Sequence, residues 1–254
     1  MIQDPLFYAA AVPAVILLGL AKGGFSGIGL LSLPLMALVI SPLQAAAISL
    51  PILMVQDVVS VGVFWRHADW RGNLRVLLPA ATVGIVAGYA FAAWVSEAMI
   101  QVIVGFVALS FAVKTLWTKR GGRIVEAARA RTASGLFWGF VSGFTSTISN
   151  AGGPPFQVHV LPQRLPRDAF VGTGAVFFGI INWIKVPAFT ALGLFTAENL
   201  KTSAALFPLA IASTAAGVWL VRRVSGERLY DIVNLLLIVV GLKLLFDGAR
   251  ALLA

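Results

Sequence analysis

The sequence predicts an all-α polytopic membrane protein. The predicted fold has two inverted repeats of about five segments each, with broken or re-entrant helices at the start of each repeat. Three observations lead there. Apolar residues make up 59% of the 254 residues and charged residues only 11%, whereas soluble domains carry about a quarter charged residues. Several apolar runs, such as 74–95 and 98–117, reach the ~20 residues of a bilayer span. The segment pattern also recurs in the second half.

Composition excludes several functions. The chain has no cysteine, which rules out disulfides and thiolate chemistry. Its net charge of +9 lies mostly in short loops between apolar segments, so the expected partner is the lipid bilayer and not nucleic acid. The start of the chain lacks the basic region of a cleaved signal peptide. We therefore expect the first apolar stretch to be retained.

The apolar segments divide the chain into three parts. A first membrane repeat covers 1–117, a basic linker covers 118–132, and a second membrane repeat covers 133–254. The expected segments of the first repeat are 7–21, 30–40, 44–65, 74–95 and 98–117, and those of the second are 133–147, 156–161, 169–192, 204–221 and 229–246.

The two halves resemble each other residue by residue. In the last two segments a constant offset of 129 aligns Pro79 with Pro208, Gly88 with Gly217, Ser96 with Ser225, and Lys114 with Lys243. Upstream the offset shrinks to about 120, where Gly19 meets Gly139. Apolar residues would match by chance, but proline, serine and lysine on one offset indicate an internal repeat.

Loop charge predicts the orientation of the two repeats. Lysine and arginine prefer cytoplasmic loops. The linker carries five basic residues against Glu126 alone, and three arginines occur both in 66–75 and in 222–228. One assignment satisfies every loop. The linker is cytoplasmic, both termini are outside, and the repeats are inverted, which is a known transporter architecture.

Each repeat begins with an apolar stretch that glycine or proline interrupts. Such a symmetric pair of short segments indicates a transporter binding site. Glycine lets backbone N–H groups approach a ligand, and a helix start adds a positive dipole end. The candidate anion-binding residues are Lys22, Gly23, Gly24 and Ser26 in the first break and Asn150, Gly152, Gly153 and Pro154 in the second. The alternative is that these glycines only let helices pack closely.

Three ionisable residues fall within or beside apolar segments, where such groups are functional by default. Lys22 would sit near mid-membrane in a re-entrant hairpin, or would extend to the cytoplasmic face if both segments span. Lys185 would face the bundle, or extend to the outer surface. Asp57 could carry a proton for coupling, or pair with a lysine. The sequence leaves each of these alternatives open.

Other polar residues carry weaker signals. His159 follows the second break and is expected to be a hydrogen-bonded packing residue, while Ser146, Thr147 and Ser149 could bind an oxyanion or their own helix backbone. The chain has no cysteine and few acidic residues, so no metal set and no cofactor are expected. No catalytic or nucleotide-binding motif occurs. We therefore expect no enzyme and no self-contained ATP-driven pump.

Two motifs resemble those of the TauE/SafE family, also called the toluene sulfonate uptake permeases. The first runs from Gly19 through Lys22-Gly23-Gly24-Phe25 to Pro34, and the second from Gly139 to Asn150-Ala151-Gly152-Gly153-Pro154-Pro155-Phe156. The stretch Phe170-Val171-Gly172-Thr173, with Asn182 and Lys185, is similar to the region that follows in many members.

The resemblance implies a multi-pass protein of the bacterial inner membrane. It implies a secondary transporter that exports or takes up sulfite, sulfonates, sulfoacetate or related small anions, and it adds Thr173 and Asn182 to the expected substrate-binding residues. An anion channel, or a carboxylate transporter of the same architecture, is the alternative. The protein could also form a homo-oligomer.

Overall fold

A computed structural model of the chain describes residues 1–25, 27–121, 131–221, 223 and 227–253. Within these ranges all regular structure is helical. The first half contains α1 (Pro5–Lys22), η1 (Ile28–Leu31), α2 (Ser32–Met36), α3 (Pro42–Phe64), η2 (Trp65–His67), η3 (Trp70–Leu74), α4 (Arg75–Trp94) and α5 (Glu97–Gly121). The second contains α6 (Thr132–Ser149), α7 (Gly153–Val160), η4 (Leu161–Gln163), α8 (Arg167–Ala191), α9 (Ala197–Leu220) and α10 (Glu227–Leu253).

Local sequence signals explain where several long helices begin. Asp4, Ser41 and Thr196 cap α1, α3 and α9, since each side chain accepts a hydrogen bond from a backbone N–H of the first turn. Proline occupies the first position of α1 and of α3, where its missing N–H removes no helical hydrogen bond. These signals lie in the sequence itself and favour helix starts at these residues independently of tertiary packing.

Seven helical stretches in the described ranges are long and apolar enough to cross a membrane. They lie in α1, α3, α4, α5, α8, α9 and α10. Large apolar side chains are exposed on these helices, among them Val58, Val86 and Trp219, and lipid is the solvent that suits such a surface. The protein is therefore an all-helical, multi-pass membrane protein.

The two short helices α2 and α7 cannot cross a bilayer. They have 5 and 8 residues, about 8 and 12 Å at the helical rise, against a hydrocarbon core of about 30 Å. Both occur where the sequence predicts the short segments 30–40 and 156–161. The prediction of an all-α protein with broken helices at these places is confirmed.

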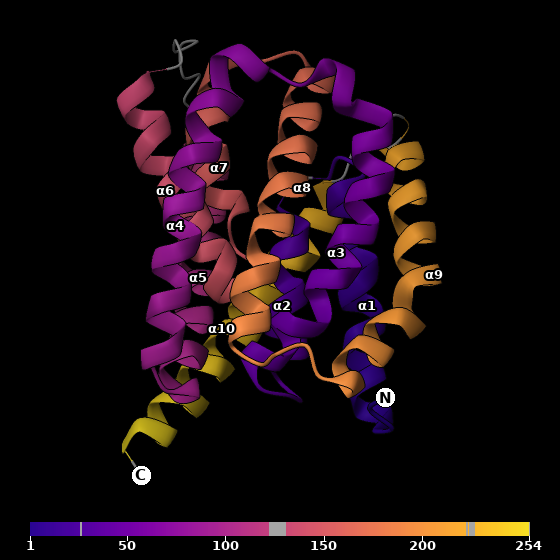
Figure 1. Cartoon of the computed structure of the whole chain (residues 1–254), viewed down its shortest axis with the longest axis vertical. Coiled ribbons are helices and arrows are strands. Elements are labelled where there is room, and N and C mark those ends of the chain that lie inside the picture. The colour runs from indigo at the N-terminus through magenta and orange to yellow at the C-terminus, as the bar shows by residue number, and fades with distance from the viewer. Residues whose placement is uncertain (26, 122–130, 222, 224–226, 254) are drawn as a thin grey trace.

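Hydrogen bonds show which helices begin at which end of the molecule. At one end, Ile2 donates to Thr202 (3.1 Å) and Gln44 to Asn199 (3.1 Å), so α1, α3 and α9 all begin there. We call it the terminal end. At the other end, which we call the linker end, Ser134 contacts His159 (3.1 Å). This contact brings the start of α6 to the end of α7 (Figure 1).

The short helices therefore return the chain to the end from which it came. The stretch from α1 through α2 begins at the terminal end and comes back to the start of α3 there. The stretch from α6 through α7 begins and ends at the linker end, where α8 also begins (Figure 1). Residues 23–25, 27 and 150–152, at the turning points of these two stretches, are buried or half-buried inside the molecule.

Small residues let helices from the two halves approach closely. A Cβ atom added at Gly23 would lie 2.3 Å from the backbone of Gly217 in α9, and one added at Gly143 would lie 2.0 Å from Ala81 in α4. A Cβ added at Gly105 of α5 would lie 2.8 Å from the carbonyl oxygen of Gly241 in α10. Helix packing in membranes relies on such contacts. They join α1 to α9, α6 to α4 and α5 to α10.

Candidate functional site

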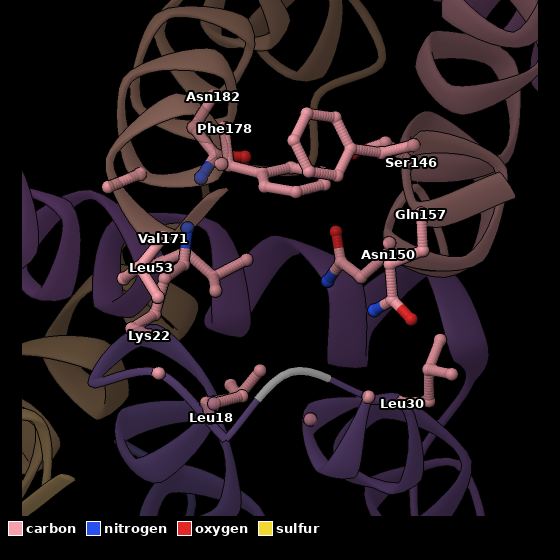
Figure 2. Close-up of a pocket in the computed structure, with 18 of the residues that line it drawn as sticks. Leu18, Lys22, Leu30, Leu53, Ser146, Asn150, Gln157, Val171, Phe178 and Asn182 are labelled. Atoms are coloured by element: carbon pink, nitrogen blue, oxygen red, sulfur yellow. The ribbon is translucent and has the colours of Figure 1, made fainter. Parts of the chain in front are cut away.

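A cavity of about 130 Å³ lies where the two helix breaks meet. One water needs about 10–15 Å³ of such space, so several waters or a small anion fit. Figure 2 shows Lys22, Phe178 and Asn182 on one side of the space, with Ser146, Asn150 and Gln157 on the other. Further lining comes from Leu18, Ala21, Gly24, Gly27, Gly29, Leu30, Leu53, Gly153, Phe156, Phe170, Val171, Gly174 and Ala175.

The first break depends on glycines in conformations that other residues avoid. The φ angles of Gly24 and Gly27 are +127° and +99°, a region that costs a side chain strain. The backbone can therefore leave α1 directly after Lys22 and line the cavity with Gly24, Gly27 and Gly29. A side chain at Gly24 or Gly27 would strain the backbone that forms the wall.

The second break is formed by Asn150, which follows α6 with φ +50°. This conformation is uncommon outside glycine, although asparagine tolerates it best. The Asn150 side chain accepts from Lys185 through Oδ1 (3.2 Å), while its buried Nδ2 has no hydrogen-bond partner among the described residues. An orphaned buried donor is costly. Because Asn150 lines the cavity, a bound anion could satisfy it.

The start of α7 offers fewer donors than a typical helix start. Gly153 is followed by Pro154 and Pro155, which have no N–H group. Two of the four free N–H groups at a helix N-terminus are therefore missing. Donors on this side of the cavity come instead from the side chains of Asn150 and Gln157.

An ion pair joins the first break to α3. The Lys22 ammonium pairs with the Asp57 carboxylate, whose other oxygen accepts from Asn182 Nδ2 (2.6 Å). The side chains of Lys22 and Asp57 are 12% and 5% exposed, and Lys22 also lies 5.3 Å from the centre of the Phe178 ring. The expectation that Asp57 could pair with a lysine is confirmed. Its role in coupling stays a prediction.

Lys185 is fully buried, with 0% of its surface exposed. Its ammonium donates to Ser146 Oγ (3.2 Å), the Ser146 carbonyl (3.4 Å) and Asn150 Oδ1 (3.2 Å), all of them neutral acceptors. Lys185 therefore faces the bundle, and extension to the outer surface is wrong. A buried ammonium that bonds only to neutral acceptors is costly. Ser146 and Asn150 lie between this ammonium and the cavity.

Asp57 and Asn182 meet midway between the two ends of the molecule. Each lies 15 residues after the first residue of its helix, Pro42 of α3 or Arg167 of α8. At a rise of ~1.5 Å per residue, this is about 22 Å from either start. Because α3 begins at the terminal end and α8 at the linker end, the contact lies near the centre of a bilayer about 40–45 Å thick.

The structure gathers most, though not all, of the residues that the sequence singles out. Lys22, Gly24, Asn150, Gly153 and Asn182 line the cavity. Asp57 and Lys185 contact lining residues. Ser26 lies outside the described residues, as does much of the basic linker. The remaining candidates Gly23, Gly152, Pro154 and Thr173 are not among the lining residues.

Packing explains the position of three of these four. A Cβ at Gly23 would collide with α9, and one at Gly152 would lie 2.8 Å from the Ser142 carbonyl oxygen. The Thr173 hydroxyl donates to Ala169 and accepts from the backbone N–H of Asp69 (2.9 Å). Thr173 thus holds the loop between α3 and α4.

Gln157, Phe178 and Leu53 line the cavity but were not expected from the sequence. Helical spacing could have found them, because residues four apart share a helix face. Gln157 lies four residues after Gly153, Phe178 four before Asn182, and Leu53 four before Asp57.

The weaker polar candidates have structural partners. Thr147 donates to the Gly143 carbonyl (3.0 Å) and Ser149 to the Thr145 carbonyl (3.0 Å), as membrane hydroxyls commonly do. His159 contacts Ser134. In the described part of the chain no group of three or more His, Asp or Glu side chains could hold a metal ion.

Comparison with known protein families identifies the family of the chain. The family model "Sulfite exporter TauE/SafE" matches residues 11–244, which is nearly the whole chain and includes both breaks. Searches of curated proteins and of solved structures gave no significant match. Members of the matched family are membrane transporters and not enzymes. With its apolar helices and its match over both halves, the chain belongs to the TauE/SafE sulfite exporter family.

Proposed function

We propose that this protein is a secondary transporter that moves a small sulfur-containing anion, such as sulfite or a sulfonate, across the bacterial inner membrane. The observation that carries the proposal is the cavity between the two breaks. It combines the ammonium of Lys22 with the Asn150 Nδ2 group, which has no hydrogen-bond partner in the described part of the chain. Both groups suit an oxyanion, because the Lys22 Nζ and the Asn150 Nδ2 donate hydrogen bonds and accept none.

The charges around the cavity support an anionic substrate. Two buried or nearly buried cations, Lys22 and Lys185, face one carboxylate, Asp57. Desolvated charges are tolerated in proteins when they are paired. The unequal count leaves one positive charge for a ligand to neutralise. An anion in the cavity would do so, whereas a cation would add to the imbalance.

Helix directions and contacts support the inverted repeat. α1, α3 and α9 begin at the terminal end, whereas α6, α8 and α4, which follows Asn73, begin at the linker end. Exchanging the halves converts the α1–α9 contact into the α6–α4 contact. It also places Asp57 of α3 on Asn182 of α8. This relation is what a transporter needs to expose one site to two sides in turn.

Basic residues support a cytoplasmic linker end. Arg66, Arg71 and Arg75 lie in or beside the loop between α3 and α4, and Arg164 lies between α7 and α8, so all four belong to the linker end. Lysine and arginine enriched on one side mark the cytoplasm. The terminal end then faces the outside.

Flux through proteoliposomes tests the proposal. The purified protein is reconstituted, and uptake of sulfite, methanesulfonate and acetate is measured with and without an imposed pH gradient and membrane potential. We expect saturable flux of the sulfur anions. Absence of flux for all three would contradict transport. Flux that never accumulates anion against its electrochemical gradient under any imposed ion gradient would indicate a channel. Faster flux of acetate than of either sulfur anion would indicate a carboxylate transporter.

A further inference from the structure

We propose that Asp57 sets the charge of the transported anion and that the cavity selects an anion with one negative charge over an anion with two. The inference rests on the proposed function and concerns the same site. It follows from three ionisable groups that come from three different elements. Lys22 ends α1, Asp57 lies in α3 and Lys185 lies in α8.

One of the three groups lines the cavity, and the other two contact residues that line it. Among the described lining residues only Lys22 carries a charge. Asp57 lies directly behind Lys22 and is held by Asn182 as well. Lys185 lies behind Ser146 and Asn150 on the facing side. With all three ionised, the set carries one net positive charge.

A single negative charge makes this set neutral, whereas a second one stays uncompensated. Charges interact strongly at such a site because the surrounding protein has a lower dielectric constant than water. The Asn150 and Gln157 side chains can bond the oxygens of either anion, but as neutral groups they do not distinguish a monoanion from a dianion. The discrimination therefore depends on the charge count, and Asp57 is the only acid in it.

Two probes of similar shape and different charge test the rule. Methanesulfonate carries one negative charge and sulfate carries two, and neither titrates near neutral pH. In proteoliposomes we expect the wild type to transport methanesulfonate in preference to sulfate. Asp57→Asn removes the carboxylate and keeps the size of the side chain. It should shift the selectivity ratio toward sulfate by about tenfold or more.

Compensating variants make the test specific to charge. Lys185→Gln lowers the net charge of the three groups from one positive charge to zero and should reduce transport of both probes. Asp57→Asn combined with Lys185→Gln returns the count to one positive charge and should restore the preference for methanesulfonate. Asp168→Asn is the matched control, since Asp168 is exposed in the first turn of α8. It changes the total charge equally and should leave the ratio unchanged.

Several results would overturn the inference. One is a wild type that transports sulfate faster than methanesulfonate at equal concentration. A second is Asp57→Asn protein that inserts, stays monodisperse and keeps the wild-type ratio. If Asp57→Asn does not fold, the selectivity ratio of the wild type and the flux through Lys185→Gln test the inference instead. Normal flux of both probes through Lys185→Gln would contradict the charge count. Absence of all flux in the wild type would contradict the proposed function itself, whereas flux with an unchanged ratio contradicts only the role of Asp57.

Discussion

Asn150 shows how one residue serves both the fold and the site. Its backbone adopts the left-handed conformation that ends α6, its Oδ1 accepts from Lys185, and its buried Nδ2 bonds to none of the residues that the structure describes. Strained residues of this kind concentrate at binding sites, where the surrounding structure holds them in place. The same residue thus links the buried cation of α8 to the cavity.

Gly153 is the cleanest position for testing the cavity. A Cβ added there meets only Gln157 Nε2, at 4.0 Å, so a larger side chain would enter the cavity without colliding with the backbone. We expect Gly153→Leu to abolish anion flux while the protein still inserts. Gly62→Leu is the matched control, because Gly62 is exposed on α3 and a Cβ there meets nothing within 4 Å. Normal flux through Gly153→Leu would show that this glycine is not part of the pathway.

Gly24 is a less specific test than Gly153. A Cβ at Gly24 would lie 2.9 Å from Val221, and φ is +127°. A side chain at Gly24 would therefore disturb the packing of α1 on α9 even if the residue never touched an anion. Loss of flux in Gly24→Leu would be consistent with either cause.

Lys185 and Lys243 provide a second comparison of like residues. Lys185 is fully buried beside the cavity, whereas Lys243 is more than half exposed and pairs with Asp247 on the outside of α10. We expect Lys185→Ala to weaken the apparent affinity for sulfite or methanesulfonate tenfold or more, about 1.4 kcal/mol. Lys243→Ala should change little, because exposed ion pairs contribute about 0–1 kcal/mol. Equal KM values for flux in the two variants would mean that Lys185 does not attract the anion.

At the scale of elements, an amide pair joins the two halves at each end of the molecule. Asn73, before α4, and Gln163, in η4, exchange two hydrogen bonds of 2.9 Å at the linker end. Gln44 of α3 donates to Asn199 of α9 at the terminal end. Asn73 and Asn199 are both buried. If the proposed transporter opens its two ends in turn, we expect the halves to separate at these pairs.

Breaking one amide pair should open one end. We expect Asn73→Ala to increase labelling of a cysteine at Ala175, which lines the cavity, several-fold from the linker side, and Gln44→Ala to increase it from the opposite side. Each change removes hydrogen bonds from a buried amide, which costs about 1–3 kcal/mol. The chain has no native cysteine, so the Ala175→Cys protein reports one site. If both changes raise labelling from the same side, the pairs do not close opposite ends.

At the scale of the whole molecule, loop charge and helix direction together predict the orientation in the membrane. Single cysteines at Arg71 and at Glu97, both exposed, report the linker end and the terminal end. We expect an impermeant reagent added to intact cells to label Glu97→Cys and not Arg71→Cys. Labelling of both from outside would contradict the arrangement in which the two ends face opposite sides. Labelling of Arg71→Cys alone would place the linker end outside and contradict the rule of basic cytoplasmic loops.

Sequence by itself determined the protein class, the segments and the family. Apolar composition and run length define a membrane protein because lipid tolerates few charges. The breaks after Lys22 and after Ser149 were predictable because glycine, proline and asparagine stop helices locally. Both breaks lie within residues 11–244, the stretch that matches the family model.

Tertiary structure alone decided which of these residues meet. Gly23 and Gly24 are consecutive glycines, yet Gly23 packs against Gly217 while Gly24 lines the cavity. Lys22 and Lys185 were each open to two interpretations. The choice depended on Asp57, 35 residues from Lys22, and on Asn150, 35 residues from Lys185. Sequence patterns report which side of one helix is apolar, but the neighbour on that side is set by how distant helices pack, so the charge balance of the cavity exists only in the folded molecule.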